Sequence, residues 1–177
     1  MTRLPGDRAV DAAAMLRVDQ AGEYGAMRIY AGQLAVLGNR HPAAREIARM
    51  QDGEARHLAT FDRMLADRQV RPTLLQPLWH VAGFALGAAT ALLGPKAAMA
   101  CTVAVETEID RHYGEQLAML ADTDPELADH ITDFRADELE HKATALANGA
   151  EEAPAYPILS AVIGAACRLA IASSKRI

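Results

Sequence analysis

Apolar residues recur at three-, four- and seven-residue steps through most of this chain, which is the spacing of one face of an α-helix. Helix breakers divide the pattern: Gly38-Asn39 ends the first stretch, Pro42 opens the second, and Gly94-Pro95 separates the third from the fourth. Asp124 and Pro125 suit an N-cap and a first helical position. No strand pattern competes. The sequence therefore predicts an all-α fold with helices at about 11–37, 42–67, 75–93, 95–121, 125–147 and 158–173.

Four of the predicted helices carry a glutamate inside their apolar stripe. Most acidic residues on helices face solvent, but a glutamate among regularly spaced apolar residues is expected to face the interior. The four stripes, in chain order, are Leu16, Glu23, Met27, Tyr30 and Leu34; Ile47, Met50, Glu54, His57, Leu58, Phe61 and Leu65; Met99, Val103, Glu106, Ile109, Tyr113 and Leu117; and Leu127, Ile131, Phe134, Glu138, His141 and Ala145.

The same glutamates form a pattern that occurs twice: a lone Glu, followed some thirty residues later by Glu-x-x-His. Glu23 precedes the motif of Glu54 and His57, and Glu106 precedes the motif of Glu138 and His141. A single Glu-x-x-His is a weak signal, but two copies that trail a Glu at nearly equal distances are a strong one. Four carboxylates and two imidazoles at these spacings are the ligands of carboxylate-bridged di-metal centres in helix bundles.

Helix geometry allows the four carboxylates to meet. If the chain folds back at residues 39–41 and 122–124, each Glu lies roughly 20–25 Å from its turn at 1.5 Å per residue. All four then lie at one level of a four-helix bundle, and each Glu-x-x-His holds one metal while its Glu bridges to the second. We expect one ferritin-like domain over residues 1–177.

The charge of this ligand set indicates which metals it would hold. Four buried carboxylates repel one another, and two divalent cations balance them while the histidines stay neutral. Mixed carboxylate and imidazole ligands suit iron or manganese better than zinc. A buried ionic network without a catalytic role is the alternative.

Other polar residues are candidates for supporting roles. Asp19 and Asp110 each lie one turn from a lone Glu, so either can orient a ligating histidine or form an ordinary surface salt bridge. Tyr30 and Tyr113 each follow a lone Glu by seven residues, and a core tyrosine is the alternative for both. His112 is adjacent to Tyr113, so at most one of the two can face the metals directly.

The composition limits the expected function and location of the protein. The net charge of −5 gives no reason to expect nucleic-acid binding. Two cysteines, Cys101 and Cys167, are too few for a disulfide scaffold, which favours a reducing cytoplasm. The first seven residues show neither an apolar signal core nor an Arg-rich transit peptide.

Two predicted helices are apolar without metal ligands. Residues 74–95 contain no Asp, Glu, Lys or Arg, but their clean apolar core, 81–93, is too short to span a bilayer. The helix at 158–173 is followed by Lys175 and Arg176, which suit anionic lipid headgroups. We expect both to be membrane-interfacial additions to the bundle, with packing in the core as the alternative. Such helices beside an oxidising centre suggest an apolar substrate from the bilayer.

Four runs of sequence resemble the demethoxyubiquinone hydroxylase family of ubiquinone biosynthesis: Leu16–Ala26, Cys101–Glu106, His112-Tyr113 and Asp137–His141. The resemblance implies a ferritin-like di-iron monooxygenase that hydroxylates the ring of a demethoxyubiquinol. It assigns one iron to Glu23, Glu54 and His57 and the other to Glu106, Glu138 and His141, with Glu54 and Glu138 bridging. It gives His112 and Tyr113 roles in substrate binding and electron transfer.

The resemblance also implies partners and a location. These are O₂ as co-substrate, NADH as reductant, a polyprenylated benzoquinol as substrate, and a peripheral place on the cytoplasmic face of the cell membrane. A lipid-binding accessory protein is a further expected partner, and homo-oligomer formation is left open. The chain departs from the family at Met50–Glu54, where Gly53 interrupts a run that is usually more charged, but both ligands of that motif remain.

Two other functions use some of the same features. A rubrerythrin- or bacterioferritin-like protein would use this ligand set to remove peroxide or to handle iron, but would have no need of the two apolar helices. A non-catalytic, membrane-associated helical scaffold would bury the same Glu and His residues as structural pairs.

Overall fold

The computed structural model describes residues 11–38, 41–120 and 122–176. Residues 1–10, together with Asn39 and Ala121 at the predicted ends of two helices, lie outside the described part. The described residues form six α-helices, one 3₁₀ turn and no strand, so the all-α prediction is confirmed. The elements are α1 (Ala12–Leu37), α2 (Pro42–Asp67), α3 (Gln76–Leu92), α4 (Pro95–Leu120), α5 (Pro125–Ala147), η1 (Ala150–Glu152) and α6 (Tyr156–Ser174).

The helix boundaries follow from local chemistry. The side chains of Asp11 and Asp124 accept hydrogen bonds from backbone N–H groups three residues later, at 2.9 and 3.2 Å, and so cap α1 and α5. Gly94, between α3 and α4, has a φ of 115°, a conformation that favours glycine. α6 begins two residues before its predicted start because Pro157 fits its first turn.

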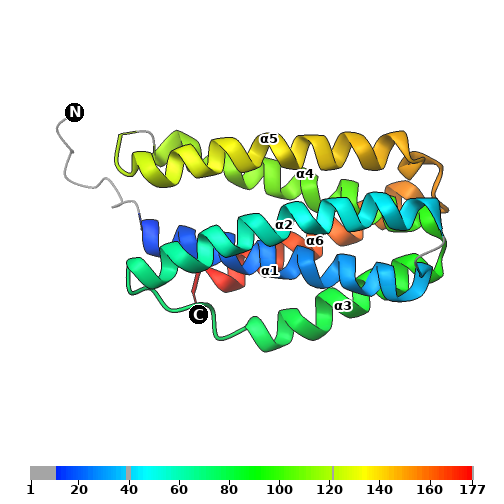
Figure 1. Cartoon of the computed structure of the whole chain (residues 1–177), viewed down its shortest axis with the longest axis horizontal. Coiled ribbons are helices and arrows are strands. Elements are labelled where there is room, and N and C mark those ends of the chain that lie inside the picture. Colours follow the sequence, from blue (N-terminus) through cyan, green and yellow to red (C-terminus); the bar gives the residue numbers. More distant parts are fainter. Residues whose placement is uncertain (1–10, 39–40, 121, 177) are drawn as a thin grey trace.

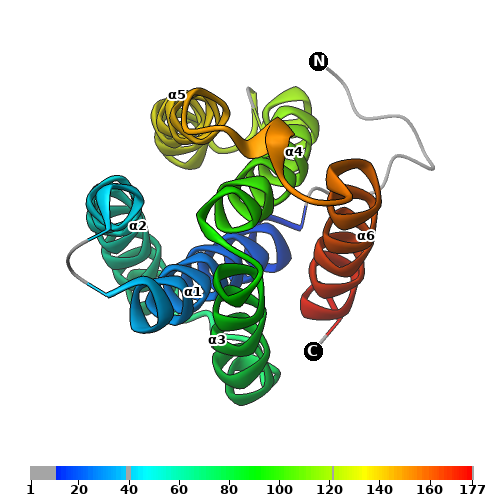
Figure 2. The same cartoon turned by 90° about the vertical axis from the view of Figure 1, so that its right-hand side faces the viewer.

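Four helices surround the centre of the molecule, and two lie outside them. Figures 1 and 2 show α1, α2, α4 and α5 as a bundle, with α3 against α1 and α6 beside α4. Two apolar clusters fill the bundle at either end. One contains Ile47 and Met99, and the other contains Leu16, Phe61 and Ile131. The predicted ligands lie in the layer between these clusters.

Glycines allow α3 to lie directly on α1. A Cβ atom on Gly32 of α1 would lie 2.1 Å from the carbonyl oxygen of Phe84, and one on Gly87 would lie 1.9 Å from that of Ile29. No larger residue fits at either position without separating the helices. Only Gly87, Thr90 and Ala91 of α3 are buried, so this helix packs on the outside of the bundle and not in its core.

Candidate metal centre

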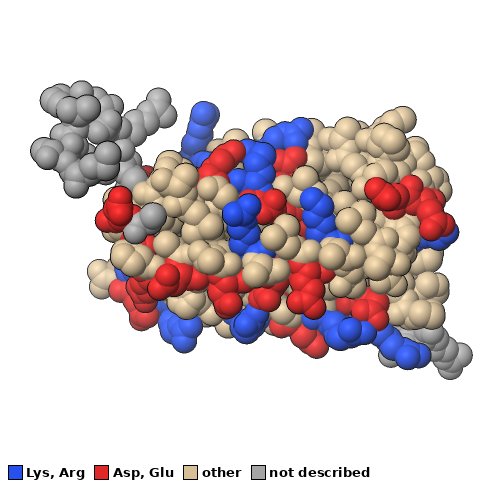
Figure 3. All heavy atoms as spheres, turned by 90° about the horizontal axis from the view of Figure 1, so that it is seen from above, with Lys and Arg blue, Asp and Glu red and all other residues tan. Residues whose placement is uncertain are grey.

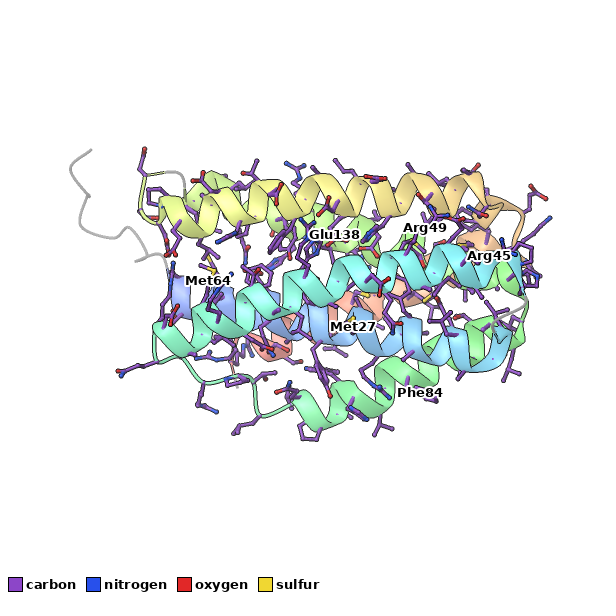
Figure 4. The ribbon with its side chains drawn as sticks, viewed as in Figure 1. Met27, Arg45, Arg49, Met64, Phe84 and Glu138 are labelled. Carbon is purple, nitrogen blue, oxygen red and sulfur yellow. The ribbon has the colours of Figure 1, made fainter. Side chains whose placement is uncertain are left out.

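The six predicted metal ligands converge in the middle of the bundle. Ligand atoms of Glu23 from α1, Glu54 and His57 from α2, and Glu138 from α5 lie within 4.8 Å of one another. Those of Glu54, Glu106 from α4, Glu138 and His141 form a second such group. Only the two glutamates of the Glu-x-x-His motifs belong to both groups, which is the arrangement expected of bridging ligands. Figure 4 shows Glu138 projecting from α5 into the space that faces α2.

Both histidines turn the same ring atom toward the carboxylates. Nδ1 of His57 lies 3.2 Å from Oε1 of Glu138 and 3.4 Å from Oε2 of Glu54. Nδ1 of His141 lies 3.1 Å from Oε1 of Glu54 and 3.4 Å from Oε2 of Glu138. Each imidazole therefore faces the glutamates of both Glu-x-x-His motifs.

The donor atoms fit a metal pair because they lack other partners. Buried polar atoms in proteins are nearly always hydrogen-bonded. Here a whole group of buried atoms has no hydrogen-bond partner among the described residues, although the residues that carry them come together in the two clusters. The group is Oε2 of Glu23, both carboxylate oxygens of Glu54 and Glu138, Oε2 of Glu106, and Nδ1 of His57 and His141.

The electrostatics of the cluster favour cations. Burial raises the pKa of Glu54 well above its usual value, and the charges of Glu138 and Glu23 raise it further. Burial and the charge of Glu138 have the same effect on the pKa of Glu106. Burial would also raise the pKa of Glu138, but the nearby side chains of His141, His57 and Glu106 outweigh it and lower that pKa to about 2. Bound cations would offset the mutual repulsion of these carboxylates and favour their ionised forms.

Two buried tyrosines exchange partners across the bundle. The hydroxyl of Tyr30, on α1, donates to Oε1 of Glu106 on α4 at 2.9 Å. The hydroxyl of Tyr113, on α4, donates to Oε1 of Glu23 on α1. Each tyrosine thus follows one lone Glu in sequence but binds the other one in space. Neither is merely a core tyrosine, because each orients a carboxylate whose second oxygen is free for a metal.

His112 is not part of the two groups of predicted ligands. It belongs to a separate buried cluster with Asp19 and Gln116. Its Nε2 is 3.2 Å from Oδ1 of Asp19, and Gln116 donates to the same oxygen at 2.8 Å. Of the adjacent pair His112 and Tyr113, only Tyr113 reaches a predicted ligand, as the sequence allowed. Burial raises the pKa of Asp19, although its hydrogen bond with His112 opposes this.

The sequence analysis did not identify the carboxylate that contacts His57, one of the predicted ligands. Oδ2 of Asp137 lies 2.9 Å from Nε2 of His57 and also accepts a hydrogen bond from Arg56. Of the two candidates proposed for this role, Asp110 pairs instead with Arg135 at 2.6 Å, and Asp19 contacts His112. A signal was present, since Asp137 directly precedes Glu138 and faces α2 across the bundle.

An apolar cavity of about 170 Å³ lies between the bundle and the two outer helices. Its walls come from α1, α3, α4 and α6 and include Gly22 and Val105, the sequence neighbours of Glu23 and Glu106. Trp79 of α3, in the wall, donates a hydrogen bond to Ser174 of α6 at 3.1 Å. The cavity joins four helices that are distant in sequence, so the helical patterns alone did not reveal it.

Known proteins resemble this chain along nearly its whole length. The family model for ubiquinone biosynthesis protein COQ7 matches residues 11–174. The 3-demethoxyubiquinol 3-hydroxylase of Rhodospirillum rubrum is 57% identical over 177 residues, which cover 99% of this chain and 84% of the relative. The human NADPH-dependent 3-demethoxyubiquinone 3-hydroxylase, mitochondrial, is 53% identical, with 92% of this chain and 76% of the relative covered. The 5-demethoxyubiquinone hydroxylase, mitochondrial, of Saccharomyces cerevisiae is 45% identical, with 92% and 77% covered.

Proposed function

Because this chain belongs to the family of ubiquinone biosynthesis protein COQ7, we infer that it is a 3-demethoxyubiquinol 3-hydroxylase of ubiquinone biosynthesis. The family resemblance and the enzyme class predicted from the sequence are thereby confirmed. The observation that carries the inference within the structure is the pair of buried clusters that share Glu54 and Glu138. The rubrerythrin-like and scaffold alternatives do not account for 57% identity to a named hydroxylase.

We propose that the buried clusters hold two iron ions. Glu23, Glu54, His57 and Glu138 would hold one, and Glu54, Glu106, Glu138 and His141 would hold the other, as the unpartnered donor atoms suggest. Bound iron would supply the activation of O₂ that puts one oxygen atom on the quinol ring. Carboxylates suit this task because they can change their binding mode as the charge on iron changes.

The surrounding residues prepare these ligands. Tyr30 and Tyr113 hold one oxygen of each lone Glu, so the other oxygen keeps a fixed direction. Asp137 holds the proton on Nε2 of His57, which leaves Nδ1 as the ligating atom. We propose that Tyr113 supports the reaction by orienting Glu23, and that His112 is a positioning residue that acts through its contact with Asp19.

We propose that the apolar cavity receives the substrate. A polyprenylated benzoquinol has an apolar tail and a compact ring, and the cavity offers walls of small apolar residues. Gly22 and Val105 place one wall beside the helix positions of Glu23 and Glu106, so a ring bound there would lie next to the centre.

The outer faces of α3 and α6 support a place at the membrane. α6 is long and apolar enough to cross a bilayer by length and composition alone, and it is little buried. Val81 of α3 and Leu169 of α6 are 65% and 68% exposed, whereas the face over α5 in Figure 3 carries acidic and basic side chains side by side. We propose peripheral binding to the cytoplasmic face of the cell membrane, with α3 and α6 in the headgroup and acyl boundary.

Other expected partners stay predictions. NADH was expected as reductant, but the mammalian relatives are named for NADPH, so both nucleotides belong in the assay. A lipid-binding accessory protein that presents the quinol, and a homo-oligomer, likewise await direct tests.

The function is tested by anaerobic iron analysis together with turnover. The purified protein, loaded with iron, is expected to contain about two iron ions per chain. It should convert a demethoxyubiquinol to the ring-hydroxylated product with O₂ and either nucleotide, as followed by mass spectrometry. Full folding with less than one iron or manganese per chain would contradict the di-metal centre. Unchanged quinone composition in a strain that lacks this protein would contradict hydroxylation.

A further inference from the structure

The two halves of the metal centre differ at one equivalent position. In the second motif the residue before the bridging Glu138 is Asp137, and in the first motif the residue before the bridging Glu54 is Gly53. The two residues occupy the same place in the repeated pattern, each facing the histidine of the opposite helix. One half therefore has a side chain at a point where the other has none.

The carboxylate of Asp137 fixes the imidazole of His57. Its Oδ2 lies 2.9 Å from Nε2 of His57, and the ring of His57 stacks on Phe134 with centroids 4.1 Å apart. The side chain of His57 is fully buried. The ring is thus held on its edge and on its face before any metal arrives.

His141 has no such support. A Cβ atom on Gly53 would lie 3.1 Å from Nε2 of His141, so the ring edge faces the place where a side chain would begin. No carboxylate among residues 11–38, 41–120 and 122–176 contacts that nitrogen, and the His141 side chain is 12% exposed. Its outer nitrogen therefore faces the glycine and solvent.

The lone glutamates and the shared carboxylates have matching contacts in the two halves. Each cluster has one lone Glu with one oxygen bound by a tyrosine, through Tyr30 on one side and Tyr113 on the other. Both clusters share the same two bridging carboxylates. Apart from the stacking of Phe134 on His57, the contrast between Asp137 and Gly53 is therefore the main difference between the two positions.

We propose that the two metal positions of this protein are unequal. The position of Glu23 and His57 binds its metal ion more tightly. The position of Glu106 and His141 takes up its metal ion second and releases it to solvent first. This inference rests on the proposed di-iron centre. Loss of a carboxylate behind a ligating histidine typically weakens metal binding 10–100-fold, and we expect affinities that differ by about this factor.

The test is an anaerobic titration of metal-free full-length protein with ⁵⁷Fe(II), followed by Mössbauer spectroscopy. One equivalent of iron should give one dominant quadrupole doublet, and a second doublet should grow only with the second equivalent. Two doublets of equal area from the first addition would overturn the inference and leave the di-iron centre intact. Failure to bind iron at all would overturn the proposed centre itself.

Two substitutions test whether the carboxylate of Asp137 causes the difference in affinity between the two metal positions. Asp137→Asn should weaken the binding of the first equivalent of iron about 10–100-fold, so that the two doublets grow together. Gly53→Asp should strengthen the binding of the second equivalent of iron, because it supplies a carboxylate near Nε2 of His141. Gly53→Ala is the matched control for helix propensity and for the close contact with the ring. An equal gain in Gly53→Ala, or an unchanged filling order in a folded Asp137→Asn protein, would overturn the assignment to the carboxylate.

Discussion

The interior of the four-helix bundle and the outer faces of α3 and α6 reverse the usual distribution of polarity. The interior buries four glutamates and a histidine with almost no exposure, whereas the outer faces leave large apolar side chains in contact with solvent. Each arrangement is costly by itself, since buried charge and exposed apolar surface both raise the free energy of a protein in water. The two regions therefore fit the two binding partners proposed above, metal ions for the interior and lipid for the outer faces.

The regions also differ in how strictly they depend on position. A ligand in the interior works only if its donor atom lies within a few ångströms of the others, so a single residue decides whether the centre forms. The free energy of apolar binding to lipid is roughly proportional to the buried area, so each exposed apolar residue contributes part of it. Substitutions in one region should leave the other unaffected, and this separation can be tested.

The largest effect is expected from Glu138→Gln in the interior. The substitution removes a carboxylate shared by both clusters, so iron content and turnover should fall to less than about 1% of the parent protein, a greater loss than a supporting residue causes. The metal-free protein should also lose stability, because the substitution removes the carboxylate charge that faces His57 and His141 in the buried cluster. Iron analysis and thermal unfolding measure the two outcomes.

Glu140→Gln is the matched control for this substitution, because Glu140 lies two residues further along α5 and is exposed. Its iron content and activity should equal those of the parent. Equal losses in both variants would show that α5 tolerates no change of charge, and that the loss is not specific to the bridging ligand.

The outer faces should respond next most strongly, through Val81→Asp on α3. Full burial of a valine contributes about 1.5–3 kcal/mol, so placing a charge there should weaken binding to anionic phospholipid vesicles about 10–100-fold. Iron content should not change. Vesicle co-sedimentation gives the affinity.

Met119→Asp is the control, since Met119 is also apolar and 46% exposed but lies on α4, away from the proposed membrane face. It should bind vesicles as the parent does. Equal weakening by both substitutions would contradict the assignment of α3 to the membrane.

The interior should also make the metal-free protein sensitive to pH. Burial would lower the pKa of His57 and of His141, but the glutamates that face their rings outweigh it and raise both values above the ordinary 6.5. The stability from these groups is fully present below pH 6.5 and is lost as pH rises through the raised values. Glu54 and Glu106, whose pKa values are also raised, act in the same direction.

We therefore expect the free energy of unfolding of the metal-free protein to fall by about 1–3 kcal/mol between pH 6 and pH 8. Glu138 adds nothing in this range, because its pKa of about 2 makes its contribution titrate at acid pH. Iron-loaded protein should show a flatter profile, since metal has replaced the protons. Thermal unfolding of both forms measures the difference, and stability of the metal-free form that rises over this range would contradict the assigned shifts.

The sequence predicted the interior far better than it predicted the boundary between the two regions. Helix ends and the six ligands follow from breakers, caps and spacing within single helices, which act over a few residues. The partners of Tyr30, Tyr113 and Asp137 depend on which helices lie side by side and on their rotation, and a pattern within one helix does not contain that information. The cavity depends on the approach of α3 to α1, which the glycines at 32 and 87 allow.

The smallest expected effect lies at the cavity, where the two regions meet. Ala170 of α6 lines it, and Ala170→Trp would fill part of its volume of about 170 Å³ without touching a metal ligand. The KM for demethoxyubiquinol should rise roughly 10-fold while iron content stays at the parent level, because a blocked apolar site mainly weakens substrate binding. Ala165→Trp, on the exposed side of the same helix, should leave KM unchanged. Steady-state kinetics with a short-tailed quinol decide the matter: an unchanged KM in Ala170→Trp would mean that the substrate reaches the buried ligands by another path, and that the outer helices serve the membrane alone.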